Sequence, residues 1–297
     1  MFTKTRIAPT PSGFLHLGNV LSFAITAAIA HQHGAKILLR IDDLDRERVD
    51  PRYVQDIFDT LHFMDIPWHE GPTDYASYEK EYSQVHRMDM YQQALTQLKE
   101  TENVFACTCS RAQIAAISRE GAYPGACRDK GIPLDREQVN WRLRTDQTGD
   151  IPITTVNAGI VQASLPPEMQ YFVVRKKDGF PAYQLTSILD DTYFGIDLVV
   201  RGEDLWPSTI AQCYLSGLLP GNTFRQTVSY HHPLLKETDD KKLSKSAGAT
   251  SIQFLRKEGK SRTDIYTMIA RELGHLMPVS DYLSLAALLP LPEYKGQ

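Results

Sequence analysis

The sequence predicts an α/β fold built around parallel strands. Residues 4–7 form a candidate strand, and the prolines and glycine of 9–13 exclude a helix directly after it. A helical pattern over 19–31 and a short apolar strand over 36–42 complete a strand–helix–strand unit. The same kind of pattern returns over 180–202, and 297 residues suffice for one large domain or two modest ones.

Helices are predicted in the stretches between and after these strands. Asp50 and Pro51 form an N-cap and a first helical position for a helix from Arg52 to Phe63. One long helix is expected over 77–101, with an apolar face made of Tyr82, Val85, Met88, Tyr91 and Leu95. Further helices are expected over 208–219, where Cys213 would lie in the core, and over 251–276.

The pattern changes between Val104 and Val174, which we interpret as an insertion. It contains the stretch 107-CTCSRAQIAAISREGAYPGAC-127, with three of the four cysteines of the chain. Cysteines bunched in this way do not form a disulfide framework, and the N-terminus lacks a secretory signal, so we expect a reducing cytoplasm. From their spacing alone, the cysteines are either metal ligands or reduced thiols.

Composition excludes two broad classes of protein. The net charge is −4 and the pI is about 6.1, so the chain as a whole is not a basic nucleic-acid binder. A local basic face in and beside the insertion remains an expectation; the residues concerned are Arg111, Arg119, Arg128 and Lys130. The apolar runs are too short to span a bilayer, which requires about 20 residues.

Two short motifs lie far apart in the chain. The first, 16-HLGN-19, opens a predicted helix, and a helix N-terminus with a histidine beside it suits a phosphate group. The second, 242-KLSKS-246, carries two lysines that could neutralise a polyphosphate. Taken singly, the first is also compatible with an accidental turn and the second with a solvated charged loop.

Together and in this order, the two motifs resemble the signatures of class I aminoacyl-tRNA synthetases. The stretches 6-RIAPTPSGFLHLGN-19, 39-LRIDDLD-45, 183-YQLTSILDD-191 and 200-VRGEDL-205 resemble the glutamyl branch of that class. The resemblance extends from Arg6 to about Ser246. It implies a Rossmann-like class I catalytic core, a ligase activity, and L-glutamate, ATP and a tRNA as partners of a protein that we expect to be monomeric.

The resemblance also implies a glutamate-binding set. Arg6 and Arg201 match the family's carboxylate-binding arginines, although Arg201 could instead form an ion pair with Glu203 or Asp204. Asp42 stands where the family usually has glutamate and would receive the substrate ammonium with a side chain one methylene shorter. The other members of the set are Ala8, Thr10 and Tyr183, and Ser187 replaces an asparagine of some relatives.

The implied chemistry is adenylation of glutamate, in which its α-carboxylate attacks the α-phosphate of ATP. His16, Gly18 and Asn19 would contact the nucleotide, and Lys245, helped by Lys242, would stabilise charge on the phosphates. Mg²⁺ would arrive with ATP. His16, Lys242 and Lys245 are therefore the candidate catalytic residues.

Only 51 residues follow Ser246, too few for the anticodon-binding region of a full-length glutamyl-tRNA synthetase. This resembles short family members that attach glutamate to the queuosine base of tRNA(Asp). Those relatives hold a structural Zn²⁺ with three cysteines and a tyrosine, and the matching residues are Cys107, Cys109, Tyr123 and Cys127. The first alternative is a trimmed synthetase that charges tRNA(Glu); the others are a non-catalytic tRNA-binding paralogue and a nucleotidyltransferase with another substrate.

The expected organisation has four parts. Residues 1–103 and 175–232 would form the two halves of the catalytic core. Residues 104–174 would form the inserted zinc-binding subdomain with tRNA contacts, and 233–297 the KLSKS loop and a small helical stem.

Overall fold

The computed structural model describes residues 2–118, 122–146, 148–235 and 251–291. The chain divides into two compact units, each described here by itself. The first contains Met1–His86, Asp197–Asp204 and Tyr230–Gln297, and the second contains Arg87–Ile196 and Leu205–Ser229.

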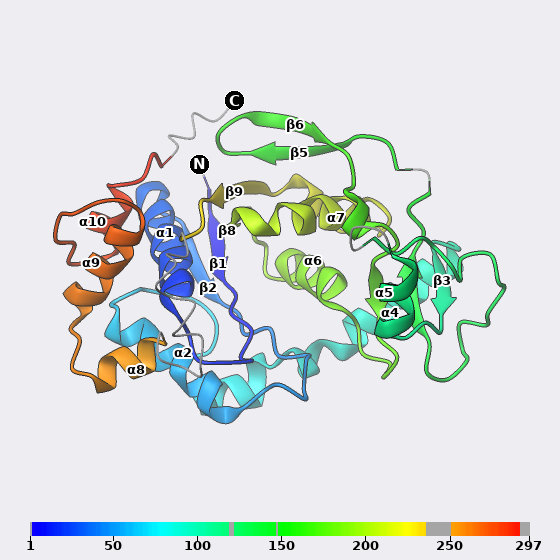
Figure 1. The fold of residues 1–297 in the computed structure, drawn as a ribbon, viewed down its shortest axis with the longest axis horizontal. Helices are drawn as coiled ribbons and strands as arrows, with labels where there is room; N and C mark the ends of the chain where they lie inside the picture. Colours follow the sequence, from blue (N-terminus) through cyan, green and yellow to red (C-terminus); the bar gives the residue numbers. More distant parts are fainter. Residues whose placement is uncertain (1, 119–121, 147, 236–250, 292–297) are drawn as a thin grey trace. The chain divides into compact units, whose positions relative to one another are not determined.

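The first unit contains the predicted strand–helix–strand arrangement (Figure 1). Strands β1 (Lys4–Ile7) and β2 (Lys36–Leu39) are parallel neighbours, joined through helix α1 (Leu17–His33). Most of α1 is apolar and buried, and it ends at Gly34, whose φ of 65° suits a residue without a Cβ. The strand predicted over 36–42 is shorter than expected.

Strand β8 (Leu198–Gly202) lies beside β1 in the same unit. The Asp197 carboxylate accepts hydrogen bonds from the backbone N–H groups of Thr3 and Lys4, at 2.7 and 2.9 Å. Strand β9 (Val228–His232) pairs with β8. The other α-helices of this unit are α2 (Pro51–Phe63), α3 (Tyr75–Ser77), α8 (Ile252–Lys257), α9 (Arg262–Glu272) and α10 (Tyr282–Ala286).

Two stretches that were each predicted to be one continuous helix are interrupted in the structure. The stretch 251–276 is broken after α8 by Gly259, with φ 77°, and Ser261 caps a new helix. The stretch 77–101 is broken at Ser83, which has extended ψ, and Val85 is 36% exposed rather than part of an apolar face. In its place stand a π-helix (Tyr78–Tyr82), a 3₁₀-helix (Gln84–Arg87) and α4 (Met88–Glu100).

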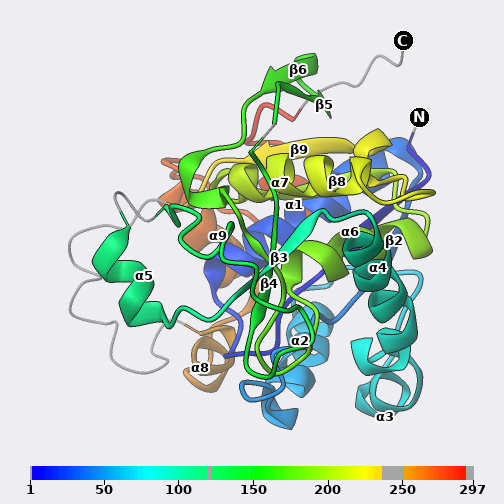
Figure 2. The ribbon, with the colours of Figure 1, turned by 90° about the vertical axis from the view of Figure 1, so that its right-hand side faces the viewer.

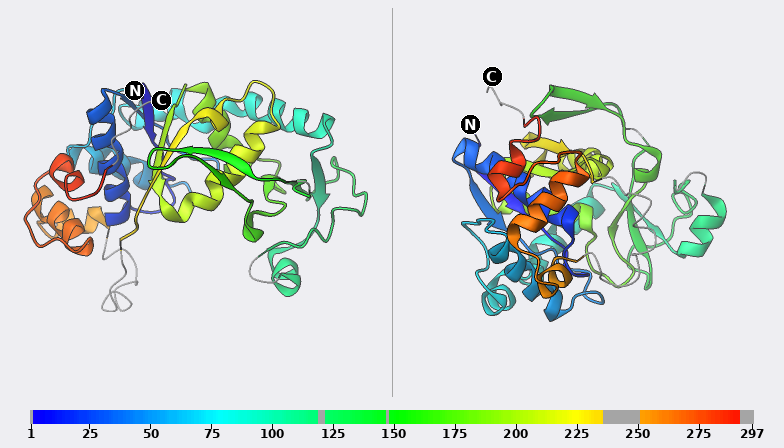
Figure 3. Two further views of the ribbon diagram at one scale, coloured as in Figure 1. Left: turned by 90° about the horizontal axis from the view of Figure 1, so that it is seen from above. Right: turned by 60° about the vertical axis from the view of Figure 1, so that its left-hand side comes forward.

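The second unit is built on an antiparallel sheet of β3 (Val104–Cys107), β4 (Asn140–Leu143) and β7 (Val173–Arg175), of which β3 and β4 are labelled in Figure 2. A hairpin of β5 (Ile151–Thr155) and β6 (Gly159–Ala163), green in Figure 3, pairs through Thr154 and Thr155 with the start of β9. Its α-helices besides α4 are α5 (Arg111–Ile117), α6 (Tyr183–Tyr193) and α7 (Trp206–Gly217). Short 3₁₀-helices cover Pro167–Met169, Glu203–Leu205 and Phe224–Gln226.

The architecture is therefore mixed α/β, as the sequence predicted. Within the described ranges, no helix combines the length and the apolar composition that crossing a bilayer requires.

Candidate active site and metal centre

His16 is the N-cap of α1, and its side chain is folded back onto the helix start. Its Nδ1 accepts a hydrogen bond from the Gly18 N–H at 3.1 Å, while the Asn19 side chain accepts from the His16 N–H at 3.0 Å. Partial burial lowers the pKa of His16 below its ordinary value, so the ring is neutral at pH 7. A neutral ring that accepts at Nδ1 carries its proton on Nε2, which can donate to an anion at the helix N-terminus.

Gly18 makes this histidine conformation possible. A Cβ at this position would lie 3.1 Å from Cε1 and 3.2 Å from Nδ1 of His16. A side chain at residue 18 would therefore crowd the imidazole, which would have to shift by a few tenths of an ångström. The glycine thus leaves room for the histidine ring, in addition to the nucleotide contact expected from the sequence.

The segment before α1 is fixed from two sides. The Leu15 N–H donates to the buried carboxylate of Asp56 on α2 at 2.9 Å, and burial raises the pKa of that carboxyl. The Leu15 carbonyl accepts from the Ile252 N–H at 2.7 Å, and His16 forms an isolated bridge with Ser251. The expected catalytic lysines, Lys242 and Lys245, lie outside the described residues; the chain re-enters the described part beside His16.

Arg6 and Arg201 lie on the neighbouring strands β1 and β8, and both are buried. Arg6 donates from Nη1 to the Val200 carbonyl at 3.2 Å. Burial, followed by the positive charges of Arg201 and Arg6 and by His232, lowers the pKa of His231 on β9 to about 3. The positive charges of both guanidinium groups thus act on a neutral imidazole, and guanidinium groups are the side chains best suited to bind a carboxylate.

The chain after β1 runs beside the chain after β2. The Arg40 N–H donates to the Ile7 carbonyl and the Asp42 N–H to the Pro9 carbonyl, both at 2.9 Å. This pairing brings the segment of Ala8 and Thr10 alongside Asp42. Ala8 is half-buried and Thr10 is exposed.

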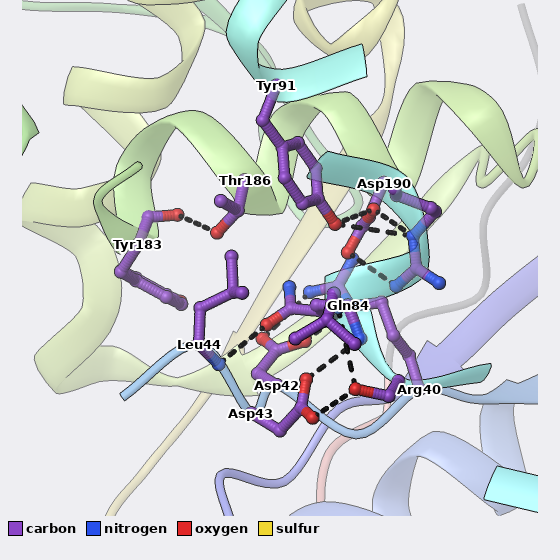
Figure 4. Close-up of polar contacts among 12 residues, drawn as sticks. Arg40, Asp42, Asp43, Leu44, Gln84, Tyr91, Tyr183, Thr186 and Asp190 are labelled. Carbon is purple, nitrogen blue, oxygen red and sulfur yellow. Dashed lines mark hydrogen bonds and ion pairs between the residues drawn. The ribbon is translucent and has the colours of Figure 1, made fainter. Parts of the chain in front are cut away.

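Asp42 is bound by an arginine that the sequence analysis did not single out. Arg40 donates from Nε to Oδ1 at 2.7 Å and from Nη2 to Oδ2 at 3.0 Å, and both side chains are buried (Figure 4). The pair holds the Asp42 carboxylate in one orientation. The fork uses one acceptor site on each carboxylate oxygen.

Asp43 is a second residue that the sequence analysis missed. Its fully buried carboxylate accepts from Tyr78 Oη at 2.7 Å, Ser83 Oγ at 2.5 Å and the Gln84 N–H at 2.8 Å. Gln84 in turn accepts from the Leu44 N–H at 3.3 Å (Figure 4). These bonds anchor the loop that carries Asp42 and explain why the helix predicted over 77–101 breaks at Ser83.

Tyr183, the expected tyrosine of the amino-acid pocket, is the first residue of α6 in the second unit and is 41% exposed. Helix α6 is tied to α4 by a buried network in which Arg87 forks onto Asp190 at 2.7 and 3.1 Å. Tyr91 donates to the same carboxylate at 2.7 Å (Figure 4). The helix that presents Tyr183 is thus rigidly supported. Ser187, on the same helix, is buried.

The three clustered cysteines converge in the second unit. The Sγ atoms of Cys107, Cys109 and Cys127 all lie within 4.8 Å of one another, and Cys109 and Cys127 are 3.5 Å apart. The Tyr123 hydroxyl is 3.3 Å from Cys107 Sγ and accepts from the Cys127 N–H at 3.0 Å. Cys107 ends strand β3, while Tyr123 and Cys127 are held in the loop after α5.

This donor set fits zinc. Ligands about 2.3 Å from a tetrahedral centre are about 3.8 Å apart. The sulfur atoms here have similar separations, 3.5 Å for Cys109 and Cys127 and no more than 4.8 Å for any pair. Burial and the neighbouring thiols raise the pKa of Cys109 to about 11. For Cys127, burial is outweighed by hydrogen bonds, first from Tyr123, which bring its pKa to about 7. Three thiols and a phenol with this spacing can close a tetrahedron, a structural rather than a catalytic geometry.

The fourth cysteine, Cys213, is buried in α7, as the sequence predicted, and is not part of this cluster.

Comparisons with known proteins agree with this geometry. Residues 3–278 match the family model for tRNA synthetases class I (E and Q), catalytic domain. The chain is 34% identical over 284 residues to the glutamyl-Q tRNA(Asp) synthetase of Parasynechococcus marenigrum, covering 93% of this chain and 84% of that protein. It is 37% identical over 241 residues to the Pseudomonas aeruginosa protein of the same name, covering 81% and 76%.

A solved structure shares the fold. The crystal structure of glutamate-tRNA synthetase from Elizabethkingia anophelis matches with a TM-score of 0.75 at 20% identity, covering 96% of this chain. This chain spans 65% of the length of that synthetase.

Proposed function

Because the chain belongs to the family of class I tRNA synthetases (E and Q), a family of ligases, we propose that it activates L-glutamate with ATP and then transfers the glutamyl group to the queuosine base of tRNA(Asp). The observation that carries this proposal is the match over 93% of the chain to a glutamyl-Q tRNA(Asp) synthetase. The placement of Tyr123 beside three thiols supports it further.

In the proposed activation step, an oxygen of the glutamate α-carboxylate attacks the α-phosphorus of ATP. The bond from that phosphorus to the bridging oxygen breaks, and pyrophosphate leaves. His16 Nε2 donates to a phosphate oxygen, while Lys242 and Lys245 neutralise charge on the phosphates. Mg²⁺, when bound with ATP, supplies further charge neutralisation on the phosphate oxygens.

Glutamate is positioned by opposite charges at its two ends. Arg6 and Arg201 bind carboxylate, and Asp42 accepts from the ammonium group. The support for this assignment is the convergence of the two arginines beside neutral His231 and the fixed orientation of Asp42. In the second step, a hydroxyl of the queuosine base attacks the activated carbonyl, and AMP leaves.

The second unit would contribute a structural zinc site. Cys107, Cys109, Cys127 and Tyr123 would hold the ion, and binding it would join β3 to the loop after α5 and stabilise the inserted subdomain of 104–174. Residues 233–297 would contribute the KLSKS motif and a helical stem.

Activation is tested by glutamate-dependent exchange of pyrophosphate into ATP without RNA. Replacing one donor to the developing charge lowers kcat by about 10²–10³-fold, so we expect a loss of this size for His16→Ala. The matched control is His31→Ala, an exposed histidine of the same helix, which leaves the rate unchanged. Wild-type protein that supports no exchange would overturn the enzyme assignment.

Transfer is tested by following labelled glutamate. We expect it on queuosine-containing tRNA(Asp), resistant to removal of the 3′-terminal nucleoside, and absent from tRNA(Asp) that lacks queuosine. Labelling of the 3′ end of tRNA(Glu) would instead identify a trimmed glutamyl-tRNA synthetase.

A further inference from the structure

Arg142 on β4 lies against the face of a proposed metal ligand. Its guanidinium carbon is 3.9 Å from the centroid of the Tyr123 ring. Arg142 pairs across the sheet with Phe105, two residues before Cys107 on β3. Residues two apart on a strand share one face, so this register places Arg142 on the same face of the sheet as Cys107.

The charge of Arg142 is buried, and no carboxylate of the described residues pairs with it. The residue is 7% exposed, and among the described residues it forms no ion pair. Nη1 donates to the Tyr171 carbonyl at 2.8 Å, and Nε has no hydrogen-bond partner within the described ranges. A buried cation is costly unless an anion lies close to it.

The filled metal site would supply such an anion. Three thiolates and a phenolate around one Zn²⁺ leave two excess negative charges in a buried cluster. A guanidinium stacked on the ring of the phenolate ligand offsets part of that charge, and groups around the ligands typically change metal affinity about 10–100-fold.

We propose that Arg142 is the counter-cation of the zinc site and the residue that positions Tyr123 for ligation. This inference rests on the proposed ligand set of Cys107, Cys109, Tyr123 and Cys127. It assigns to the neighbouring strand β4 a function in metal binding that the ligands alone do not reveal.

The test is zinc affinity, measured by competition with a chromophoric chelator on purified full-length protein. Arg142→Met should weaken zinc binding about 10–100-fold, and Arg142→Lys should restore part of it by returning the charge. The matched control is Arg175→Met on the adjacent strand β7, where the guanidinium lies 5.0 Å from the Trp141 ring and away from the thiols. This control should bind zinc as the wild type does.

A double-mutant cycle separates a specific effect from general loosening of the sheet. In a Tyr123→Phe background, Arg142→Met should weaken zinc binding by a smaller factor than in the wild type, because the phenolate is already gone. Equal factors in both backgrounds would overturn the positioning role. Glu120 lies outside the described residues, so Glu120→Gln tests a carboxylate as the alternative partner; unchanged zinc affinity is expected.

The outcomes are distinguishable from failure of the proposed function. Wild-type protein that binds no zinc overturns both the ligand set and the role of Arg142, whatever the transfer assay gives. Zinc bound equally by the wild type and Arg142→Met overturns only the role of Arg142. Absorbance of the cobalt-substituted proteins provides a second readout: thiolate charge-transfer bands persist in Arg142→Met at saturating metal if the site is weakened but still assembled.

Discussion

Each unit of the molecule contains a buried arginine that forks onto an aspartate, and the two pairs have nearly the same geometry. Arg40 and Asp42 in the first unit are joined at 2.7 and 3.0 Å. Arg87 and Asp190 in the second are joined at 2.7 and 3.1 Å. The first pair is two positions apart in sequence and the second 103 positions apart.

The pairs differ in their surroundings. Asp190 is fully buried, also binds Tyr91, and ties α4 to α6. Asp42 lies just beyond the carboxyl end of a parallel strand, the edge at which α/β folds bind their ligands. The two pairs therefore cannot be told apart by bond geometry; the position of Asp42 beyond a strand end is what supports its proposed contact with substrate.

The largest loss of stability is expected when the pair of Arg87 and Asp190 is broken. Arg87→Met leaves the Asp190 charge buried without its partner, which typically costs about 3–5 kcal/mol of stability. Urea unfolding followed by circular dichroism measures this loss. Removing both charges in Arg87→Met/Asp190→Leu should cost less than the single change. A single variant within about 1 kcal/mol of the wild type would contradict the assigned role, since that is the range of exposed pairs.

A smaller loss of stability is expected at Asp43, which anchors the loop that carries Asp42. Asp43→Asn removes the charge that accepts from Tyr78, Ser83 and Gln84, and hydrogen bonds to charged groups contribute about 1.5–3 kcal/mol. We expect the free energy of unfolding to fall by about 2 kcal/mol in the same urea measurement, because the amide oxygen keeps one of these hydrogen bonds. The exposed neighbour Asp45 provides the control, since Asp45→Asn should be neutral. Equal effects at the two positions would show that Asp43 is not the anchor of the loop.

Asp43 also shows which parts of the fold the sequence could predict and which it could not. The first strand–helix–strand unit, the Asp50 cap of α2 and the histidine at the start of α1 follow from local patterns, and all are found. The break at Ser83 could not be predicted from periodicity, because its cause is Asp43, 40 positions away. Local helical preference over 77–101 was overridden by one buried carboxylate.

The candidate sites also contain some residues that the sequence could predict and others that it could not. The spacing of the three cysteines pointed to a cluster, and the thiols do converge. Arg142 gave no signal, since nothing in its own surroundings links it to Tyr123, and only the pairing of β4 with β3 brings them together. Arg40 could have been found from the sequence, because side chains two positions apart in an extended segment point to the same side, and Arg40 stands two positions before Asp42.

Removing the charge of Asp42 sharpens the comparison by separating binding from stability. Asp42→Asn should raise the KM for glutamate about 10–100-fold, since a charged hydrogen bond of about 1.5–3 kcal/mol is lost, while the KM for ATP stays unchanged. Pyrophosphate exchange at varied glutamate concentrations measures this. Stability should fall as well, because the buried Arg40 guanidinium loses its paired charge, so both quantities are measured. Unchanged glutamate affinity combined with a large stability loss would place Asp42 in the structural class of Asp190.

The smallest effect is expected when Asp42 is lengthened. Asp42→Glu keeps the charge and adds one methylene to a side chain that is 7% exposed and oriented by Arg40. If an ammonium group binds here, the carboxylate can reach it directly or through one water, and such bridges are nearly as favourable as direct bonds. We therefore expect a KM for glutamate within about threefold of the wild type, less than 1 kcal/mol. Asp190→Glu is the matched comparison: the same added methylene in a fully buried network should destabilise by about 1–3 kcal/mol through overpacking. If both lengthened variants lost stability equally and Asp42→Glu also lost glutamate binding, the space around Asp42 would be as closed as that around Asp190. The two pairs would then have the same structural role.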